Sequence, residues 1–591
     1  MKSRQHAGFA APVRNLRLAT ASALALLCST AVRAQVVEVN LTATPGTAQV
    51  APGTSVNAWL YNGSLPGPTL RITEGQTLRV RFRNELPEAT AVHWHGQPVP
   101  LGMDGVPSIS RPAVAPGQEF IYELNDLVPG TYWYHPHGNE TQLSKGPAGM
   151  LIVDPANAAS DPTFDVEHTI ILDDWSNPLG GAFSGHLLNG RSSLGQVPFD
   201  VQPGQKLRIR VVNVASTTNY VFALDGHPMT VTHADGNRVQ PVVTQAIPIG
   251  IGERWDVIVD CNNPGTWSFA VSDIANRTST LVRGVIRYTG QGAPIPAANY
   301  VPANLSGGSL LSYSQLASFH PVQPITSTPD RSYTASLGMG MGPGGMAHLI
   351  NGQAWPNVTP FLTSTGENVQ LTISNGGMMM MPFYHPMHIH GHFFRLMGTA
   401  GGTTAPPIKD TILIRPAGQP GSSFTSQITM DNPRHWLFHC HNADHMGAGM
   451  MTIFDYLGDD DGDGIETRSD MEPTADIPVV TISSFASAFT PGASDVIRVQ
   501  WTQGQVVALF AGPAELQQWS QIPNLGLLVL DPATASPLGA ALTSPSGEAT
   551  FPYALPNNPA IVGTRVGIQG VGIDAPSGDL VLTTFQALTA N

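Results

Sequence analysis

Two short segments recur three times along this 591-residue chain, and this internal repeat limits what the chain can fold into. The first segment is a turn followed by an alternating strand pattern, and it occupies residues 74–84, 203–213 and 366–375. The second is a Gly- or Pro-containing turn before an aromatic strand, and it occupies residues 129–134, 264–269 and 432–438. Strand-forming repeats of this kind predict three similar β-sandwiches in succession.

The composition agrees with short strands joined by turns. Charged residues make up only 12% of the chain, while 61 Gly and 51 Pro interrupt it often, so long helices are not expected. The chain is too long for a single hydrophobic core and therefore predicts several domains. Its net charge of −14 argues against nucleic acid as a partner.

Residues 1–34 have the pattern of a secretory signal peptide. Basic residues precede an uncharged run over residues 18–32, and small residues lead to a cleavage site after Ala34. The uncharged run is too short for a membrane anchor, so no stable membrane insertion is expected. We therefore expect an exported protein, either periplasmic or extracellular.

Histidine pairs distinguish the first and third copies of the repeat from the second. These copies contain His93-Trp94-His95, His135-Pro136-His137, His388-Ile389-His390 and His439-Cys440-His441. Residues two apart in a strand share one face, so each pair presents two imidazoles to the same side. The middle copy has no such pairs, and we expect its domain to bind no metal.

Cys440 divides its strand between two sites. If residues 436–438 form a buried strand, His439 and His441 share one face and Cys440 points to the other. His445 and Met450 follow shortly after and can join Cys440 on its side. A thiolate, two imidazoles and a weak axial thioether form a blue-copper electron-transfer site. The second imidazole must come from elsewhere in the chain.

The four motifs resemble those of the multicopper oxidases, in particular the three-domain laccase-like branch, over about residues 40–457. The resemblance implies an all-β fold of three consecutive cupredoxin-like Greek-key β-sandwich domains, here followed by a C-terminal β-sandwich-like domain. It also implies four copper ions. Type 1 copper would be held by His385, Cys440 and His445, with Met450 as the axial ligand. Type 2 copper would be held by His93 and His388, and the type 3 pair by His95, His135, His137, His390, His439 and His441.

The same resemblance implies a reaction. A phenol or aromatic amine would lose one electron at a time at the type 1 copper, and O2 would be reduced to water at the other three copper ions. Cys440 would connect the two sites through its neighbours His439 and His441. Asp104 stands where similar enzymes keep a carboxylate that handles protons, although an Asp before Gly is also typical of a turn.

Two other functions compete with this interpretation. Thirteen of the 18 methionines fall between Met339 and Met451, including Met339, Met341 and Met346, and thioethers bind Cu(I). A cuprous or other metal-ion oxidase in copper tolerance is therefore an alternative, and loosely packed loop filler is another explanation of these methionines. A non-enzymatic pseudo-oxidase that binds a partner is the third possibility, but such a protein would have lost ligands, and none is lost here.

The end of the chain carries an acidic segment and a further domain. Asp459, Asp461 and Asp463 alternate as in the first half of a calcium loop, and Asp470 stands at position twelve, where such a loop has a bidentate Glu. A calcium site and an acidic linker both remain open. The predicted divisions are a signal peptide (1–34), domain one (35–156), domain two (157–292), a linker (293–330), domain three (331–457), an acidic linker (458–472) and a C-terminal β domain of unknown role (473–591).

Overall fold

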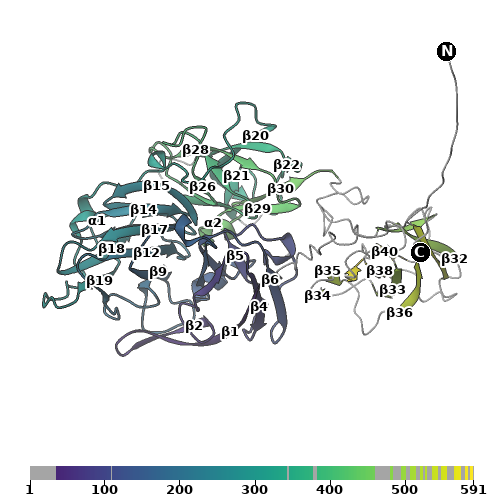
Figure 1. Cartoon of the computed structure of the whole chain (residues 1–591), viewed down its shortest axis with the longest axis horizontal. Coiled ribbons are helices and arrows are strands. Elements are labelled where there is room, and N and C mark those ends of the chain that lie inside the picture. Colours follow the sequence, from purple (N-terminus) through teal and green to yellow (C-terminus); the bar gives the residue numbers. More distant parts are fainter. Residues whose placement is uncertain are drawn as a thin grey trace, which may run out of the picture.

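A computed structural model describes residues 35–107, 109–342, 345–376 and 382–458, together with the backbone of the strands between residues 479 and 589. The described chain is built almost entirely from strands, which confirms the predicted all-β class (Figure 1). Its two α-helices are single turns, α1 (Ala303–Gly307) and α2 (Ala443–Gly447). The short 3-10 helices are η1 (Leu101–Met103), η2 (Glu140–Lys145), η3 (Ala158–Ser160) and η4 (Tyr313–Gln315).

Two of the predicted features lie outside the described residues. These are the signal peptide and the acidic segment with Asp459, Asp461, Asp463 and Asp470. Within the described part of the chain, no helix combines the length and the hydrophobicity needed to cross a bilayer.

The first sandwich consists of two four-stranded sheets with the orders β2-β1-β4-β6 and β3-β8-β7-β5 (purple in Figure 1). Apolar side chains of both sheets, including Trp94 and Tyr122, pack into one buried core. The strands are β1 (Val36–Ala51), β2 (Thr54–Tyr61), β3 (Leu70–Thr73), β4 (Thr77–Asn84), β5 (His93–His95), β6 (Glu119–Leu124), β7 (Gly130–His135) and β8 (Gly149–Asp154).

The second sandwich has a six-stranded sheet, β10-β9-β12-β17-β14-β15, and a five-stranded sheet, β11-β19-β18-β13-β16. Its core includes Cys261, which is buried and free, as expected for a small apolar residue. The strands are β9 (Val166–Trp175), β10 (Gly185–Leu188), β11 (Phe199–Val201), β12 (Lys206–Asn213), β13 (Tyr220–Leu224), β14 (Met229–Ala234), β15 (Asn237–Thr244), β16 (Ala246–Ile249), β17 (Arg254–Asp260), β18 (Thr266–Asp273) and β19 (Val282–Tyr288).

The third sandwich repeats this pattern with the sheets β21-β20-β23-β28-β25-β26 and β22-β30-β29-β24-β27. Cys440 and Met450 lie in its apolar core. The strands are β20 (Arg331–Gly342), β21 (Gly345–Ile350), β22 (Phe361–Thr363), β23 (Asn368–Asn375), β24 (His385–Ile389), β25 (Phe394–Leu396), β26 (Ile408–Lys409), β27 (Thr411–Ile414), β28 (Ser423–Thr429), β29 (His435–Cys440) and β30 (Met451–Tyr456).

The C-terminal part of the chain also forms antiparallel sheets, with the orders β31-β32-β37, β36-β33-β38-β39 with β40 beside β38, and β34-β35. These strands are β31 (Val479–Ser483), β32 (Ser494–Gln500), β33 (Val506–Pro513), β34 (Ser520–Ile522), β35 (Gly526–Leu528), β36 (Ser536–Leu542), β37 (Glu548–Ala554), β38 (Arg565–Ile573), β39 (Leu580–Leu582) and β40 (Gln586–Thr589).

The sequence repeat corresponds to one parallel strand pair that occurs in each sandwich. The pairs are β1–β4, β9–β12 and β20–β23. The turn before the second strand of each pair contains a glycine with left-handed backbone, namely Gly75 (φ 81°), Gly204 (φ 87°) and Gly366 (φ 82°). A side chain would strain this conformation, which explains why all three copies have glycine at this position.

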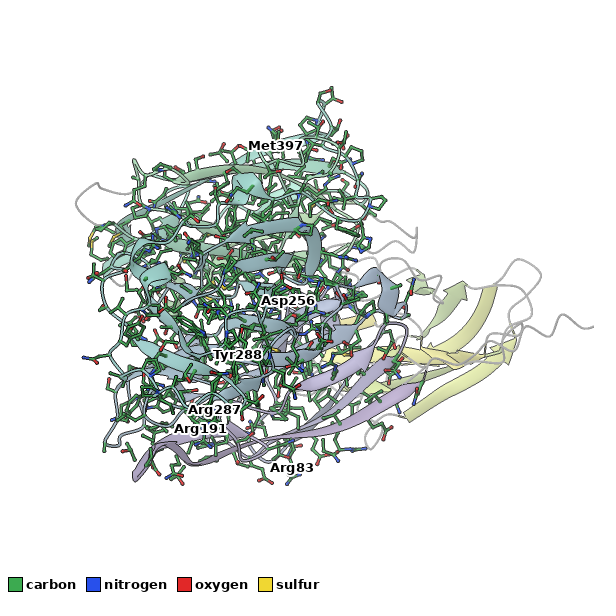
Figure 2. The ribbon with its side chains drawn as sticks, turned by 60° about the vertical axis from the view of Figure 1, so that its left-hand side comes forward. Arg83, Arg191, Asp256, Arg287, Tyr288 and Met397 are labelled. Carbon is green, nitrogen blue, oxygen red and sulfur yellow. The ribbon has the colours of Figure 1, made fainter. Side chains whose placement is uncertain are left out.

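A buried ion-pair cluster joins the first and second sandwiches. The Asp256 carboxylate of β17 accepts hydrogen bonds from Arg208 at 2.6 Å, from Arg210 at 3.1 Å and from the Thr131 hydroxyl of β7 at 2.8 Å. Figure 2 shows Asp256 among packed side chains, whereas Arg83 lies at the edge of the molecule. Because Asp256 is 1% exposed, its charge depends on these partners, and the two sandwiches are held in one arrangement.

The segment predicted to be a linker (293–330) packs against the second sandwich. Leu311 and Leu316 are buried in the core of that sandwich. Tyr313 stacks on Trp255 of the second sandwich and also contacts Phe424 of the third. The segment therefore connects the two sandwiches through buried contacts.

Candidate metal centre

Eight histidines from the first and third sandwiches meet in one buried cluster. In the first sandwich, β5 pairs with β7 so that His93 lies opposite His135. In the third, β24 pairs with β29 so that His388 lies opposite His439. Strand register thus brings histidines that are far apart in sequence to the same sheet edge. The cluster, called the histidine cluster below, comprises His93, His95, His135, His137, His388, His390, His439 and His441.

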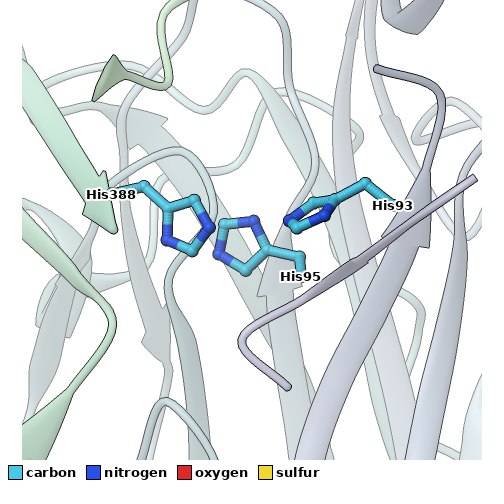
Figure 3. A group of neighbouring side chains, drawn as sticks. All are labelled: His93, His95 and His388. Carbon is cyan, nitrogen blue, oxygen red and sulfur yellow. The ribbon is translucent and has the colours of Figure 1, made fainter. Parts of the chain in front are cut away.

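Rings from the two sandwiches stack on one another inside the histidine cluster. The His95 and His388 centroids are 3.7 Å apart with an interplanar angle of 14°, and those of His93 and His390 are 4.0 Å apart. Figure 3 shows His95 between His388 and His93, with His388 reaching in from the opposite side. The cluster therefore forms only when the first and third sandwiches are packed together.

Hydrogen bonds leave one nitrogen of most of these rings without a partner. The Nδ1 atoms of His93, His135 and His388 donate to the backbone carbonyls of Asp104, Pro136 and Asp410, at 2.8, 2.8 and 3.0 Å. A carbonyl only accepts, so Nε2 of each ring carries a lone pair.

Within the histidine cluster, the buried ring nitrogens with no hydrogen-bond partner are Nε2 of His93, His135, His137 and His388, Nδ1 of His95 and both nitrogens of His441. Each unsatisfied buried group costs about 1–3 kcal/mol. Metal ions bound among these atoms would satisfy them, and imidazole is a suitable ligand for copper.

The nitrogens converge in three neighbouring sets of three. In each set, one ligand atom per residue lies within 4.8 Å of the others: His93, His95 and His388; His95, His135 and His441; and His137, His390 and His439. Burial lowers the pKa of His388 to about 4 and that of His390 to about 3, so these rings are neutral near pH 7. Neutral imidazoles in adjacent sets can hold several metal ions side by side.

Asp104 follows η1 directly and lies against two rings of the cluster. Its Oδ2 accepts a hydrogen bond from His390 Nδ1 at 2.9 Å, and its Oδ1 lies 3.1 Å from His93 Nδ1 without a formal hydrogen bond. Burial acts to raise the pKa of Asp104, but His390 and His93 outweigh burial and hold that pKa below its usual range. Asp104 is thus a buried carboxylate that orients His390, as acidic partners of metal-binding histidines do.

The second sandwich has no histidine in this cluster, but its buried charged residues form ion pairs with Lys409 and Asp410 of the third sandwich beside the cluster. Arg254 of β17 donates to both oxygens of Asp410, at 2.7 and 2.6 Å, and Asp410 Oδ1 accepts from His95 Nε2 at 3.2 Å. Lys409 forms ion pairs at 2.9 Å with Asp235 and with Glu253. All five charged residues are 0% exposed. No metal-ligand motif pointed to them; the one available signal was the charged run 253–256 within an otherwise apolar strand.

A second site forms on the other face of β29. Cys440 Sγ lies 3.5 Å from His445 Nδ1 and 3.8 Å from His385 Nδ1, and the two Nδ1 atoms are 3.1 Å apart. The structure thus brings a second imidazole, His385 of β24, to the predicted cysteine. Met450 is fully buried, and its backbone carbonyl accepts a hydrogen bond from the Cys440 amide at 3.0 Å.

Burial controls the protonation of this second site. It raises the pKa of Cys440 to about 12 and lowers the pKa of His385 to about 3 and that of His445 to about 2. The metal-free thiol is therefore protonated, and metal binding must release its proton. His348 of β21, which no sequence motif marked, stacks on His445 at 4.0 Å, and one of its ring nitrogens lies within 4.8 Å of ligand atoms of His385 and His445.

Comparisons with known proteins agree with this geometry. Three sequence models, each described as multicopper oxidase, match residues 42–158, 167–291 and 322–459. The multicopper oxidase MmcO of Mycobacterium tuberculosis is 32% identical over 470 residues, covering 71% of this chain and 87% of that protein. Laccase-1 of Trametes villosa is 28% identical, covering 69% and 88%. The crystal structure of Fet3p, described as a multicopper oxidase in iron import, has the same fold with a TM-score of 0.63, 22% identity and coverage of 71% and 90%.

The ion pair between Arg254 and Asp410 can be tested in the metal-free protein. Arg254→Met keeps the side-chain length but leaves a buried carboxylate without its partner, so we expect the free energy of unfolding to fall by about 3–5 kcal/mol. Urea denaturation followed by tryptophan fluorescence measures this change. Arg71→Met is the matched control, because Arg71 pairs with Asp154 at a side-chain exposure of 44%, and it should cost about 1 kcal/mol or less. Equal losses in the two variants would contradict the role of the buried pair.

Proposed function

This chain belongs to the multicopper oxidase family of copper-dependent, O2-reducing oxidoreductases, and we propose that it is an exported laccase-like enzyme that oxidises phenols or aromatic amines. The observation that carries this proposal is the arrangement around β29. Cys440 contributes to the second site, while its direct neighbours His439 and His441 belong to the histidine cluster. A centre that accepts single electrons is thereby linked by covalent bonds to a buried centre with several metal positions.

We propose the following distribution of copper. Type 1 copper is held by His385, Cys440 and His445 with Met450 as axial ligand, type 2 copper by His93 and His388, and the type 3 pair by His95, His135, His137, His390, His439 and His441. The three sets of converging nitrogens and the unpartnered ring atoms support this assignment. When bound, copper supplies one-electron transfer at the Cys440 site and four-electron reduction of O2 to water at the histidine cluster.

The protein's own residues keep the two half-reactions apart. The histidine cluster is buried, so an organic donor stays outside while O2 is small enough to enter. His439 Nδ1 donates a hydrogen bond to the Cys440 carbonyl at 3.0 Å, which orients this ring and leaves Nε2 for metal. Oxygen reduction consumes protons, and we propose that the buried Asp104 carboxylate, whose Oδ1 has no hydrogen-bond partner, passes them on to the site of oxygen reduction.

A metal-ion oxidase in copper tolerance is the second candidate, and the hairpin of β20 and β21 favours it. Met341 lies opposite Met346, and these side chains are 78% and 63% exposed. Exposed thioethers are ligands for Cu(I). Residues 378–381, the other methionine run, lie outside the described residues.

A pseudo-oxidase that only binds a partner is the third candidate. Such a protein has no need to keep a full set of buried ligands. The proposed ligands are all present in this chain, and each is buried. This completeness favours an enzyme over a binding protein.

Replacing Cys440 tests the electron path. Cys440→Ser removes the thiolate, so we expect the blue absorption to disappear and phenol-driven O2 consumption to fall to background, while the histidine cluster keeps its copper. Visible absorption, copper analysis and an oxygen electrode measure the three properties. Cys261→Ser is the control, because Cys261 is buried in the second sandwich and contacts neither site. Phenol-driven O2 consumption that persists in Cys440→Ser would refute the proposed path.

Replacing Asp104 tests proton uptake. Asp104→Asn preserves the shape of the side chain but cannot hold a proton for oxygen reduction, so we expect turnover to fall by about a hundredfold or more. Copper content and blue absorption should stay normal. Reoxidation of the reduced protein by O2, followed by stopped-flow absorption, locates the defect. If Asp104→Asn reoxidises at the normal rate, Asp104 is only a turn residue.

The hairpin methionines distinguish the first two candidates. On the laccase proposal, the double variant Met341→Leu, Met346→Leu oxidises a phenol and Cu(I) at unchanged rates, because leucine keeps the apolar bulk of the hairpin face and neither thioether is a proposed copper ligand. Met397→Leu, in a different strand connection, is the control. Parallel assays with 2,6-dimethoxyphenol and with Cu(I) measure both rates. A loss confined to Cu(I) would support the metal-ion oxidase instead.

A further inference from the structure

His348 covers the imidazole of His445, the outermost ligand of the proposed type 1 site. The two rings lie face to face, with centroids 4.0 Å apart and an interplanar angle of 25°. The backbone holds this position, because the His348 amide donates to the Ala448 carbonyl at 3.0 Å, directly after α2. This bond fixes the backbone of β21 beside the turn that carries His445 and so places the His348 side chain next to that ring.

Phe383 closes the edge of the same ring pair. It lies edge-on to His348 and to His445, with centroids 5.3 Å from each. As a result His445 is only 5% exposed and His348 is 9% exposed. An organic donor cannot lie flat on His445 unless His348 moves away.

One face of the hairpin formed by β20 and β21 extends from its solvent-exposed end to His348, and not to His445. In the register of β20 and β21, Met339 lies opposite His348, and Met341 lies opposite Met346. Residues two apart in a strand share a face, so these four side chains occupy one face of the hairpin. Met341 and Met346 are at its exposed end, and His348 is at its buried end against His445. A donor that approaches along this face meets His348 first.

We propose that His348 is the residue that the electron donor contacts, and that it selects planar aromatic donors able to pack against its ring. This inference rests on the proposed function and adds the place where the donor binds. A phenol at this position gives one electron to the protein through the stacked His348 and His445 rings and releases its hydroxyl proton to water. A phenoxyl radical leaves, and further phenols supply the remaining electrons that O2 takes up as it becomes water.

Two substitutions of His348 distinguish a donor's contact with an aromatic ring from simple filling of the space above His445. His348→Phe keeps a flat ring over His445, whereas His348→Leu fills the site without a ring. We expect anaerobic reduction of the blue centre by 2,6-dimethoxyphenol to stay close to the wild-type rate in His348→Phe. In His348→Leu it should slow by about tenfold or more, because small losses of alignment can cost about a hundredfold in a positioned reaction. Stopped-flow bleaching of the blue absorption measures both rates.

Two controls make the result specific. The reduction potential of each variant is measured by redox titration, because His348 contacts the ligand His445 and its replacement can shift the potential, and the rates are compared after correction for any shift. His320→Leu replaces an exposed histidine remote from this site and should reduce at the wild-type rate. Blue absorption and copper content show that each variant is folded and loaded.

Three results would overturn the inference. The first is a wild-type reduction rate in His348→Leu, and the second is an equal slowing in His348→Phe and His348→Leu. The third is a slowing fully explained by a shifted potential. The proposed function fails in a different way, namely if the copper-loaded wild-type protein has no blue absorption or is not reduced by phenols.

Discussion

The two-residue period of β29 is the constraint on which the rest of this structure depends. Because alternate side chains point to opposite faces, Cys440 lies in the core of the third sandwich while His439 and His441 face the first. The register with β24 sets His388 opposite His439. A slip of one residue would send the thiol into the histidine cluster and the imidazoles into the apolar core. Burial of β29 between β24 and β30 makes such a slip costly.

The histidine cluster is an interface, and its geometry depends on all three sandwiches. The first and third sandwiches supply the rings, which interlock by stacking between His95 and His388. The second supplies Arg254, whose ion pair with Asp410 supports the hydrogen bond that His95 donates to Asp410. Buried charges are stable only when they are fully paired, so this network ties the relative position of the sandwiches to the position of the ligands. The middle copy, which contributes no histidine to the cluster, is therefore more than a spacer.

The region around His445 shows how one copper site can be adapted to different donors. The ligands Cys440, His385 and His445 lie beneath a cover formed by His348 and Phe383. This cover comes from a hairpin and a loop, segments that can vary without disturbing the strands that hold the metal. Near the buried His445 ring the side chains are aromatic, and at the exposed end of the hairpin they are thioethers. The same face thus carries groups that suit aromatic donors and groups that suit metal ions. On the proposed function, this cover would set the choice between phenols and metal ions without changing the electron path.

The sequence alone determined the class of fold and the candidate ligands, because both depend on local patterns. Turn glycines and alternating strands predicted repeated sandwiches, and residue spacing of two placed His93 with His95 and His439 with His441. The domain limits and the assignment of individual copper ions remain predictions.

Only the tertiary structure decided which of these residues meet and what surrounds them. Asp410, Arg254 and Lys409 were not predicted, since their role comes from contacts between sandwiches that no local pattern records. His348 was missed for the same reason, because it contacts the ring of His445 in α2, which lies 97 positions later in the chain. Short sequence patterns determine which residue types lie close together along the chain, but burial and long-range packing decide which polar groups become partners.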